Sequence, residues 1–308
     1  MGTPDFAAES LKSIYEAGEE IIGVVTNPDK PKGRGMKMCY SPVKEFALEK
    51  NLEIYQPEKV KKNTEFIEKI KELNPDVICV VAYGKILPKE ILDIPKYGCV
   101  NVHASILPKY RGAAPIQWAV INGDSKTGVT TMQMDEGMDT GDILICEKVD
   151  IDKNETTGEL WDKLSIIGGK VLVKTLNKIE DGTITRTKQG DNYTMAPMLN
   201  KELSKINWQE KTSLEIKNLT RGLNPIMGTY AFLDGKKYKF WSVEIADENG
   251  IENKNEEAGT ILIEKQGLYV KTKDGALKIN IIQPENSKRM NVCDFLRGNR
   301  LEVGKKFE

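Results

Sequence analysis

The chemistry of this chain is most concentrated around its one histidine, His103. Imidazole is the side chain whose ordinary pKa lies near neutrality, so His103 is the first candidate for moving protons. Asn101 lies two residues earlier on the predicted strand 99–103 and shares its face, because side chains alternate along a strand. A loop rich in Pro and Gly follows that strand, at the edge where open α/β sheets bind ligands. We therefore predict that Asn101 and His103 face one binding site together.

A second polar cluster, residues 134–143, is acidic and forms turns. Gly137 and Gly141 allow the chain to turn tightly there. A carboxylate from such a loop can orient a histidine ring and favour its protonated form. The spacing alone does not select one of the four candidates, which are Asp135, Glu136, Asp139 and Asp142.

Several other kinds of chemistry lack their motifs. The sequence contains no GxGxxG, GxxxxGK[ST] or GxSxG pattern, which disfavours dinucleotide, nucleoside triphosphate and α/β-hydrolase sites. Ser105 is only two residues from His103, which is a poor position for a nucleophile that this histidine would activate. The five cysteines are odd in number and widely spaced, so we predict free, buried thiols and no metal site.

Length and composition are those of a globular protein with two domains. The chain has 308 residues, of which 39% are apolar and 30% charged. No apolar run approaches the ~20 residues that a membrane span requires, and no charged-then-apolar leader opens the sequence. We expect a cytoplasmic, monomeric protein without membrane contact.

Strand and helix patterns alternate through residues 1–181. Strands separated by helical crossovers form a doubly wound, mostly parallel sheet with both faces covered. We therefore predict a Rossmann-like α/β catalytic domain over 1–181. Its strands are expected at 20–26, 76–82, 99–103, 130–134 and 143–149, and its helices at 6–17, 42–50, 64–73, 113–122 and 157–180.

The pattern changes beyond a weakly periodic stretch, 182–204, which we assign to a linker. Short strands at close spacing in 205–308 predict a small C-terminal β-barrel of the OB type. This region carries 18 Lys and Arg against 15 Asp and Glu, so it is the more positive part of a chain with net charge −1. Its helices are expected at 213–222 and 292–298, and its strands at 229–233, 238–245, 259–264, 268–272 and 277–283.

A series of short motifs runs along essentially the whole chain. They are residues 2–6, 27–35, 81–88, 101–116, 138–142, 206–208, 221–225 and 298–301. In this order they resemble the methionyl-tRNA formyltransferase family. Asn101, His103 and Asp139 match the triad of all 10-formyltetrahydrofolate-dependent formyltransferases, whereas the GRG loop at 33–35, the RGAAPIQ motif at 111–117 and the barrel are similar to the tRNA enzymes in particular.

The resemblance implies transfer of the formyl group of 10-formyltetrahydrofolate, a cosubstrate, to the α-amine of methionine on initiator tRNA. It implies that Asn101 and His103 stabilise an oxyanion, that His103 also moves a proton, and that Asp139 holds His103. No metal is implied. The folate-binding residues expected from the family are Tyr83, Gly84, Ile86, Leu87, Ser105, Ile106, Leu107 and Pro108.

Two basic clusters are candidates for binding the tRNA. The resemblance places a basic finger in the loop 27–38, and lysines of the barrel would offer a track for phosphates. The candidate residues are Lys30, Lys32, Arg34 and Lys37 in the loop, and Lys236, Lys237 and Lys239 in the barrel.

Two alternative functions remain open. A related formyltransferase would act on a small amine, such as a glycinamide nucleotide or an amino sugar, but such a substrate needs neither a barrel nor a basic finger. A plain RNA-binding protein with a degenerate α/β domain would show no dependence on folate.

The start of the chain departs from the family pattern. A short apolar strand precedes Gly-Thr-Pro-Asp-Phe in the family, whereas Met1 alone precedes Gly2 here. We expect that strand to lie between residues 21–26 and the strand ending at His103. Each buried backbone group left unpaired costs about 1–3 kcal/mol. We therefore expect the natural product to carry roughly five to seven more apolar residues, one strand's length, at this end.

Overall fold

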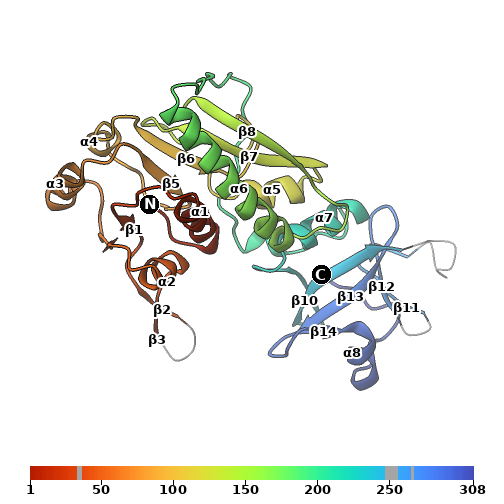
Figure 1. The fold of residues 1–308 in the computed structure, drawn as a ribbon. Helices are drawn as coiled ribbons and strands as arrows, with labels where there is room; N and C mark the ends of the chain where they lie inside the picture. The colour runs from red at the N-terminus through yellow and green to blue at the C-terminus, as the bar shows by residue number, and fades with distance from the viewer. Residues whose placement is uncertain (33–36, 247–255, 265–266) are drawn as a thin grey trace. The chain divides into compact units, whose positions relative to one another are not determined.

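The computed structural model describes residues 1–32, 37–246, 256–264 and 267–308 of the chain. These residues form two compact units, seen in the ribbon of Figure 1. The first unit consists of Met1–Pro115, Lys126–Asp150 and Trp161–Ala196, and the second of Ile116–Ser125, Ile151–Leu160 and Pro197–Glu308. The stretch 182–204 is thus divided, and its residues up to Ala196 belong to the first unit.

A mixed sheet forms the centre of the first unit. Its four strands lie in the order β5-β6-β7-β8, with β5 and β6 parallel and the other neighbours antiparallel. Residues 134–142 join β7 to β8, and so short a connection between neighbouring strands requires antiparallel directions. The predicted α/β class is confirmed. The bounds are β5 Ile78–Val81, β6 Cys99–His103, β7 Lys126–Gln133 and β8 Ile143–Asp150.

Met1 and Gly2 lie between this sheet and a separate parallel pair, β1 (Val24–Val25) and β4 (Ile54–Tyr55). The Val81 amide donates to the Met1 carbonyl at 2.9 Å, and the Gly2 amide donates to Val25 O at 2.9 Å. Met1 and Gly2 therefore lie between β1 and β5, beside an apolar cavity of about 160 Å³. The sequence analysis expected a strand at this end of the chain to lie next to the strand ending at His103. That expectation was wrong, because β6 has β5 and β7 on its two sides.

Helices cover both faces of the sheet in the first unit. Alternate residues of β5 show this, because Ile78 and Val80 join the apolar cluster of the helices on one face, while Cys79 and Val81 face the other side, where the first helix packs. The bounds are α1 Asp5–Glu16, α2 Pro42–Glu49, α3 Thr64–Leu73, α4 Lys89–Leu92 and α6 Thr157–Glu180.

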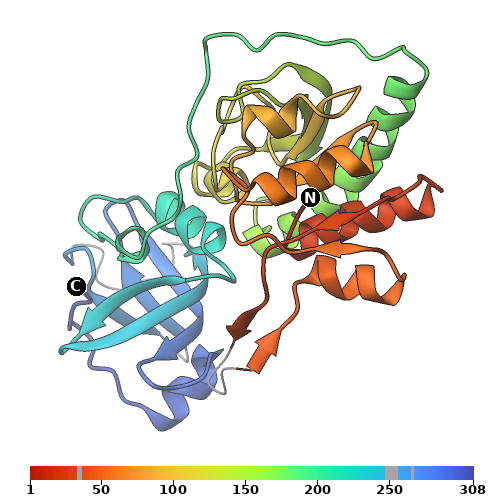
Figure 2. The ribbon, with the colours of Figure 1, turned by 90° about the vertical axis from the view of Figure 1, so that its left-hand side faces the viewer.

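Local sequence explains where these helices begin and how closely they pack. Ser41 caps α2 by accepting from the Lys44 amide, and Asn63 caps α3 in the same way. Gly168 of α6 allows a close approach to the sheet, since a Cβ there would lie 3.2 Å from the Phe6 ring and 3.3 Å from Val102. Residues 181–201, which follow α6, form no regular helix or strand (Figure 2).

The second unit contains a curled antiparallel sheet that forms half of a barrel, consistent with the predicted OB-like domain. The strand order is β11-β12-β13-β10-β9, with β14 paired to β13. The bounds are β9 Thr229–Leu233, β10 Lys236–Ile245, β11 Ile261–Glu264, β12 Gly267–Lys271, β13 Ala276–Pro284 and β14 Met290–Asn291, with α5 Pro115–Ile121 (its first residue in the first unit), a 3-10 turn η1 Glu202–Ser204, α7 Ser213–Gly222 and α8 Val292–Gly298.

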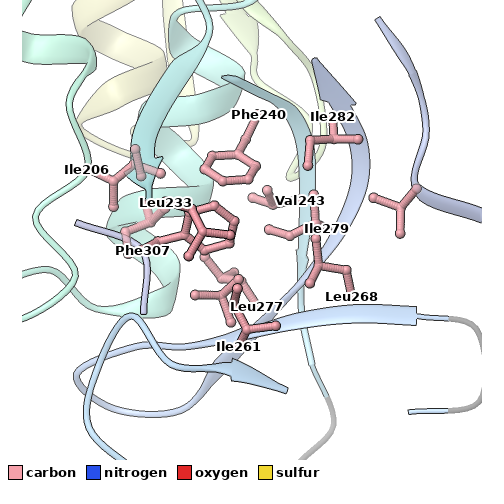
Figure 3. Close-up of a cluster of buried hydrophobic side chains, with 14 of the residues drawn as sticks. Ile206, Leu233, Phe240, Val243, Ile261, Leu268, Leu277, Ile279, Ile282 and Phe307 are labelled. Carbon is pink, nitrogen blue, oxygen red and sulfur yellow. The ribbon is translucent and has the colours of Figure 1, made fainter. Parts of the chain in front are cut away.

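The last residues of the chain bind to both edges of that sheet. Glu308 exchanges two backbone hydrogen bonds of 2.8 Å with Phe232 of β9, and the Ile261 amide of β11 donates to Lys305 O at 2.7 Å. Phe307 then fills the interior, where its ring meets Phe240 edge-on at 5.3 Å (Figure 3). Residues 304–308 therefore bridge the two edge strands of the half-barrel, β9 and β11.

Two sequence-based expectations about surfaces can be compared with the fold. Cys99 is buried as expected, but Cys39, Cys146 and Cys293 are exposed, because they lie on a hairpin, on the edge strand β8 and on the outer side of α8. None of the helices in the described part of the chain combines the length and the apolar character that a membrane span requires.

Candidate active site

Strand β6 presents Asn101 and His103 on one face, as the period of a strand requires. His103 is 6% exposed, and its Nε2 lies 2.8 Å from the carbonyl oxygen of Tyr110. Because a carbonyl can only accept, Nε2 carries the proton of this bond. Asn101 is half-buried, and its side-chain amide has no hydrogen bond to any residue that the structure describes. That amide is therefore available to a ligand.

Of the four acidic candidates, Asp139 is the one that meets the histidine. Its Oδ2 lies 3.6 Å from His103 Nδ1 and accepts a 2.8 Å hydrogen bond from the Gly112 amide. Asp135 instead accepts from Gly137 and Thr140 within its own loop. His103 is thus held between a carbonyl oxygen and a carboxylate, an arrangement that fixes the plane of its ring.

Residues of the stretch 182–204, which the sequence suggested as a linker, complete this site. The Gln189 side-chain amide donates to Asp139 O at 2.9 Å and to Gly141 O at 2.7 Å. Its oxygen accepts from Nε and Nη2 of Arg111, at 3.0 and 2.7 Å. Arg111 also lies over the ring of Tyr193 at 4.6 Å. Sequence analysis missed Gln189, since nothing in its neighbourhood marks it.

The loop after β6 contributes mainly its backbone. Ser105 and Leu107 are buried, whereas Ile106 and Pro108 are half-buried. The Ser105 hydroxyl donates to Lys109 O at 2.6 Å, and Ser105 O accepts from the Thr130 hydroxyl at 2.7 Å. The Ser105 hydroxyl is therefore committed to the loop, which leaves backbone groups and the half-buried side chains for a ligand.

The loop after β5 leaves the sheet at the same edge, because β5 and β6 are parallel and Val81 pairs with Val102. Gly84 has the left-handed φ of 73°. Leu87 is buried, whereas Ile86 is 78% exposed, which is unusual for a large apolar side chain. Tyr83 is buried with no partner for its hydroxyl among the described residues, and burial raises its pKa to about 12. Ile86 thus offers an exposed apolar side chain in the loop that follows β5, whereas Tyr83 belongs to the buried apolar cluster beneath it.

Known proteins match both parts of the chain. The formyl transferase family model matches residues 1–176, and the model of the formyl transferase C-terminal domain matches residues 198–300. The chain belongs to the formyl transferase family. The methionyl-tRNA formyltransferase of Caldanaerobacter subterraneus subsp. tengcongensis is 50% identical over 99% of this chain and 97% of its own length. That of Clostridioides difficile is 51% identical over 99% and 97%.

A solved structure shares the fold of this formyl transferase. The N-formyltransferase of Helicobacter canadensis, in complex with folinic acid and dTDP-3-aminofucose, is superposed with a TM-score of 0.66. It covers 94% of this chain and 97% of its own, at 19% identity. At this identity the likeness concerns the architecture.

Among the described residues no group of three or more His, Cys, Asp or Glu could hold a metal ion.

The basic loop of this formyl transferase is a hairpin of β2 (Lys30–Lys32) and β3 (Lys37–Cys39). Lys30 is exposed; Arg34 lies outside the described residues, as do the side chains of Lys32 and Lys37. Asn27 anchors the base of the hairpin by donating to the Thr3 hydroxyl at 2.9 Å and to Tyr83 O at 3.0 Å. The base of the hairpin, which follows β1 in the chain, is thus tied to the loop that follows β5.

A second basic surface lies on the sheet of the second unit. Lys236 is exposed, Lys237 lies 3.4 Å above the Tyr230 ring, and Lys239 donates to Met227 O at 3.1 Å. Arg289, which sequence analysis did not single out, lies 3.1 Å above the ring of Trp241. Burial lowers the pKa of Lys239, and the positive charges of Lys237 and Arg289 lower it further. These cations therefore lie close together, and Lys237, Lys239, Arg289, Tyr230 and Trp241 are called the cation–aromatic patch below.

Proposed function

We propose that Asn101, His103 and Asp139 are the catalytic group with which this protein formylates methionyl-tRNA. The enzyme transfers the formyl group of 10-formyltetrahydrofolate to the α-amine of methionine on initiator tRNA, as its near-full-length likeness to methionyl-tRNA formyltransferases supports. The observation that carries the residue assignment is the seating of His103 between Tyr110 O and Asp139, beside the uncommitted amide of Asn101.

Direct attack by the substrate amine explains the chemistry without a covalent enzyme intermediate. The amine nitrogen forms a bond to the formyl carbon, the bond from that carbon to the folate nitrogen breaks, and a proton passes from the amine to the folate nitrogen. Ser105 is not an attacking group, because its hydroxyl is buried and bound to Lys109 O. The protein must therefore stabilise the oxyanion of the tetrahedral intermediate and help the proton to move.

Each of the three side chains takes one part in this scheme. The Asn101 amide donates to the oxyanion. His103 lies one alternation further along β6; in this scheme its Nε2–H leaves Tyr110 O when the substrates bind, donates to the same oxyanion and relays the proton. Asp139 contacts Nδ1, so it sets the orientation of the ring. The arrangement parallels the way a carboxylate orients histidine in other catalytic groups.

Binding of the two substrates is assigned to the remaining surfaces. The loops 83–87 and 105–108 take the folate, for which exposed Ile86 is suited. The tRNA is bound through its phosphates by two sets of basic residues, which are Lys30, Lys32, Arg34 and Lys37 of the sequence segment 27–38 and Lys236, Lys237 and Lys239 of the second unit. The proposal also includes a catalytic domain at 1–181, a linker at 182–204 and a tRNA-binding domain at 205–308. We propose further that the protein is monomeric and cytoplasmic.

One assay tests this function against its alternatives. Labelled formyl transfer from 10-formyltetrahydrofolate is measured with charged initiator tRNA, charged elongator tRNA, free methionine and an amino-sugar nucleotide as acceptors. We expect transfer to methionyl initiator tRNA at a kcat/KM far above that of the small amines. Preference for a small amine would establish the alternative formyltransferase, and RNA binding without any folate-dependent transfer would establish a plain RNA-binding protein.

A further inference from the structure

Gln189 makes four hydrogen bonds that connect three separate segments of the first unit. Its Nε2 donates to Asp139 O and Gly141 O, and its Oε1 accepts twice from Arg111. The orientation of the amide follows from its partners, because carbonyl oxygens only accept and a guanidinium only donates. Gln189 therefore binds the acidic loop on one side and the loop after β6 on the other.

The acidic loop needs such support at the residue that meets His103. Asp139 has a φ of 53°, in the left-handed region that non-glycine residues adopt rarely. Gly141, two residues on, leaves no room for a Cβ, which would collide with Gln133 O. The backbone of Asp139 is thus in a conformation that surrounding contacts must maintain, and the chain just after it is tightly packed at Gly141.

Arg111 is held as firmly as the glutamine it binds. Its amide donates to Thr194 O at 2.9 Å, and its carbonyl accepts from the Ala196 amide at 2.7 Å. Arg111 is 9% exposed, and its guanidinium lies over the Tyr193 ring. Gly112, whose amide binds Asp139, is the next residue along the chain. The same short segment therefore fixes Gln189 from one end and the Asp139 carboxylate from the other.

We infer that Gln189 is a positioning residue that acts on the reaction through Asp139. Its two N–H groups hold the backbone of residues 139 and 141, and this directs the Asp139 carboxylate at His103 Nδ1. Arg111 in turn orients Gln189. The inference rests on the proposed role of Asp139, and it assigns a catalytic purpose to the chain between α6 and the second unit.

Two substitutions separate positioning from a merely structural role. Gln189→Glu keeps the side chain's size and an oxygen partner for Arg111, but it removes both N–H donors. Gln189→Ala removes both kinds of contact. Asn192→Ala is the matched control, because Asn192 is exposed in the same segment. Melting temperature, KM for each substrate and single-turnover kcat are measured for all three.

We expect Gln189→Glu to lower kcat by about 10–10²-fold, the effect of a small misplacement of a catalytic group, with the melting temperature unchanged. Gln189→Ala should lose as much kcat and also some thermal stability, whereas Asn192→Ala should behave as wild type. If Gln189→Glu keeps wild-type kcat, the donors do not position Asp139 and the inference is overturned.

A double-mutant cycle identifies the route of the effect. In an Asp139→Ala background, Gln189→Glu should change kcat by less than about 3-fold, since residues that act through one another are not additive. Full additivity would overturn the inference while leaving the role of Asp139 intact. Wild-type kcat in Asp139→Ala alone would instead refute the proposed catalytic group, and with it the basis for this positioning.

Discussion

The strand end that carries His103 and the surfaces that carry the basic residues are built on different physical terms. At the strand end, hydrogen bonds run from loop to loop, and the ring of His103 has a defined oxygen at each nitrogen. On the cation–aromatic patch, Lys237 and Arg289 lie over aromatic rings, and Arg289 also donates from Nη2 to Pro225 O at 3.1 Å. Transfer of a formyl group requires fixed geometry, whereas attraction of a phosphate backbone requires only charge at the right density.

The difference predicts its largest effect at His103. His103→Ala should lower kcat by about 10²–10⁴-fold, because no second imidazole is present in the chain to take over the proton. Folate binding, followed by quenching of protein fluorescence, should be largely kept. Near-normal turnover of this variant would show that the strand end is not the site of chemistry.

A somewhat smaller loss is expected at Asn101. Asn101→Ala should reduce kcat by about 10²–10³-fold, the effect of removing one oxyanion donor, while KM for both substrates changes little. Asn101→Asp is the control for size, and it should be no better, because it replaces the donor with a negative charge. A variant that raises KM alone would make Asn101 a binding residue.

Single cations of the patch should contribute far less. Arg289→Ala should raise KM for the tRNA a few-fold, leave kcat unchanged and reduce the slope of log KM against log salt by about one, as loss of one phosphate contact does. Arg289→Lys keeps the charge and should retain most of the salt slope. An unchanged slope in the alanine variant would place the tRNA elsewhere.

The smallest effect concerns the base of the basic hairpin. Lys44 donates to Asp29 at 2.5 Å, and this bond, together with one from Gln56, holds the pKa of Asp29 below its ordinary 3.8. A carboxyl group with a lowered pKa stabilises the folded state above pH 3.8, and that contribution is lost as pH falls through the lowered value.

Lys44→Met should therefore be slightly less stable than wild type at pH 7, with the difference shrinking as the pH falls below about 4. Urea unfolding at a series of pH values measures this, and Lys12→Met, at an exposed position of α1, is the control. A difference that stays constant with pH would mean that Lys44 acts through packing of its stem.

The sequence predicted those parts of the site that depend on one strand and its neighbours. The bounds of β6 agree with the prediction, and the period of a strand placed Asn101 and His103 together. The spacing of residues 134–142 does not distinguish Asp139 from the other three carboxylates, and it was the resemblance to the family that selected it. Gln189 could not be found, since its partner Arg111 is 78 positions away in the chain.

Architecture shows the same limit. Alternating strands and helices predicted the α/β class, but not that β6, β7 and β8 run antiparallel. The place of Met1 between β1 and β5 also depended on strand order, which is a property of long-range pairing. The local period was sufficient to place side chains along one strand, whereas the order and direction of the strands depend on partners distant in the sequence.

The closure of the second unit by residues 304–308 has a consequence for the order of events during synthesis. Ribosomes add roughly 5–20 residues each second, and domains form as their chain emerges. Strands β9 to β13 can pair early, but Phe232 has no partner at its edge until Glu308 leaves the exit tunnel. The first unit can therefore fold while this sheet still exposes an open edge, the feature that invites pairing with other chains. The second unit is therefore the part that completes its folding last.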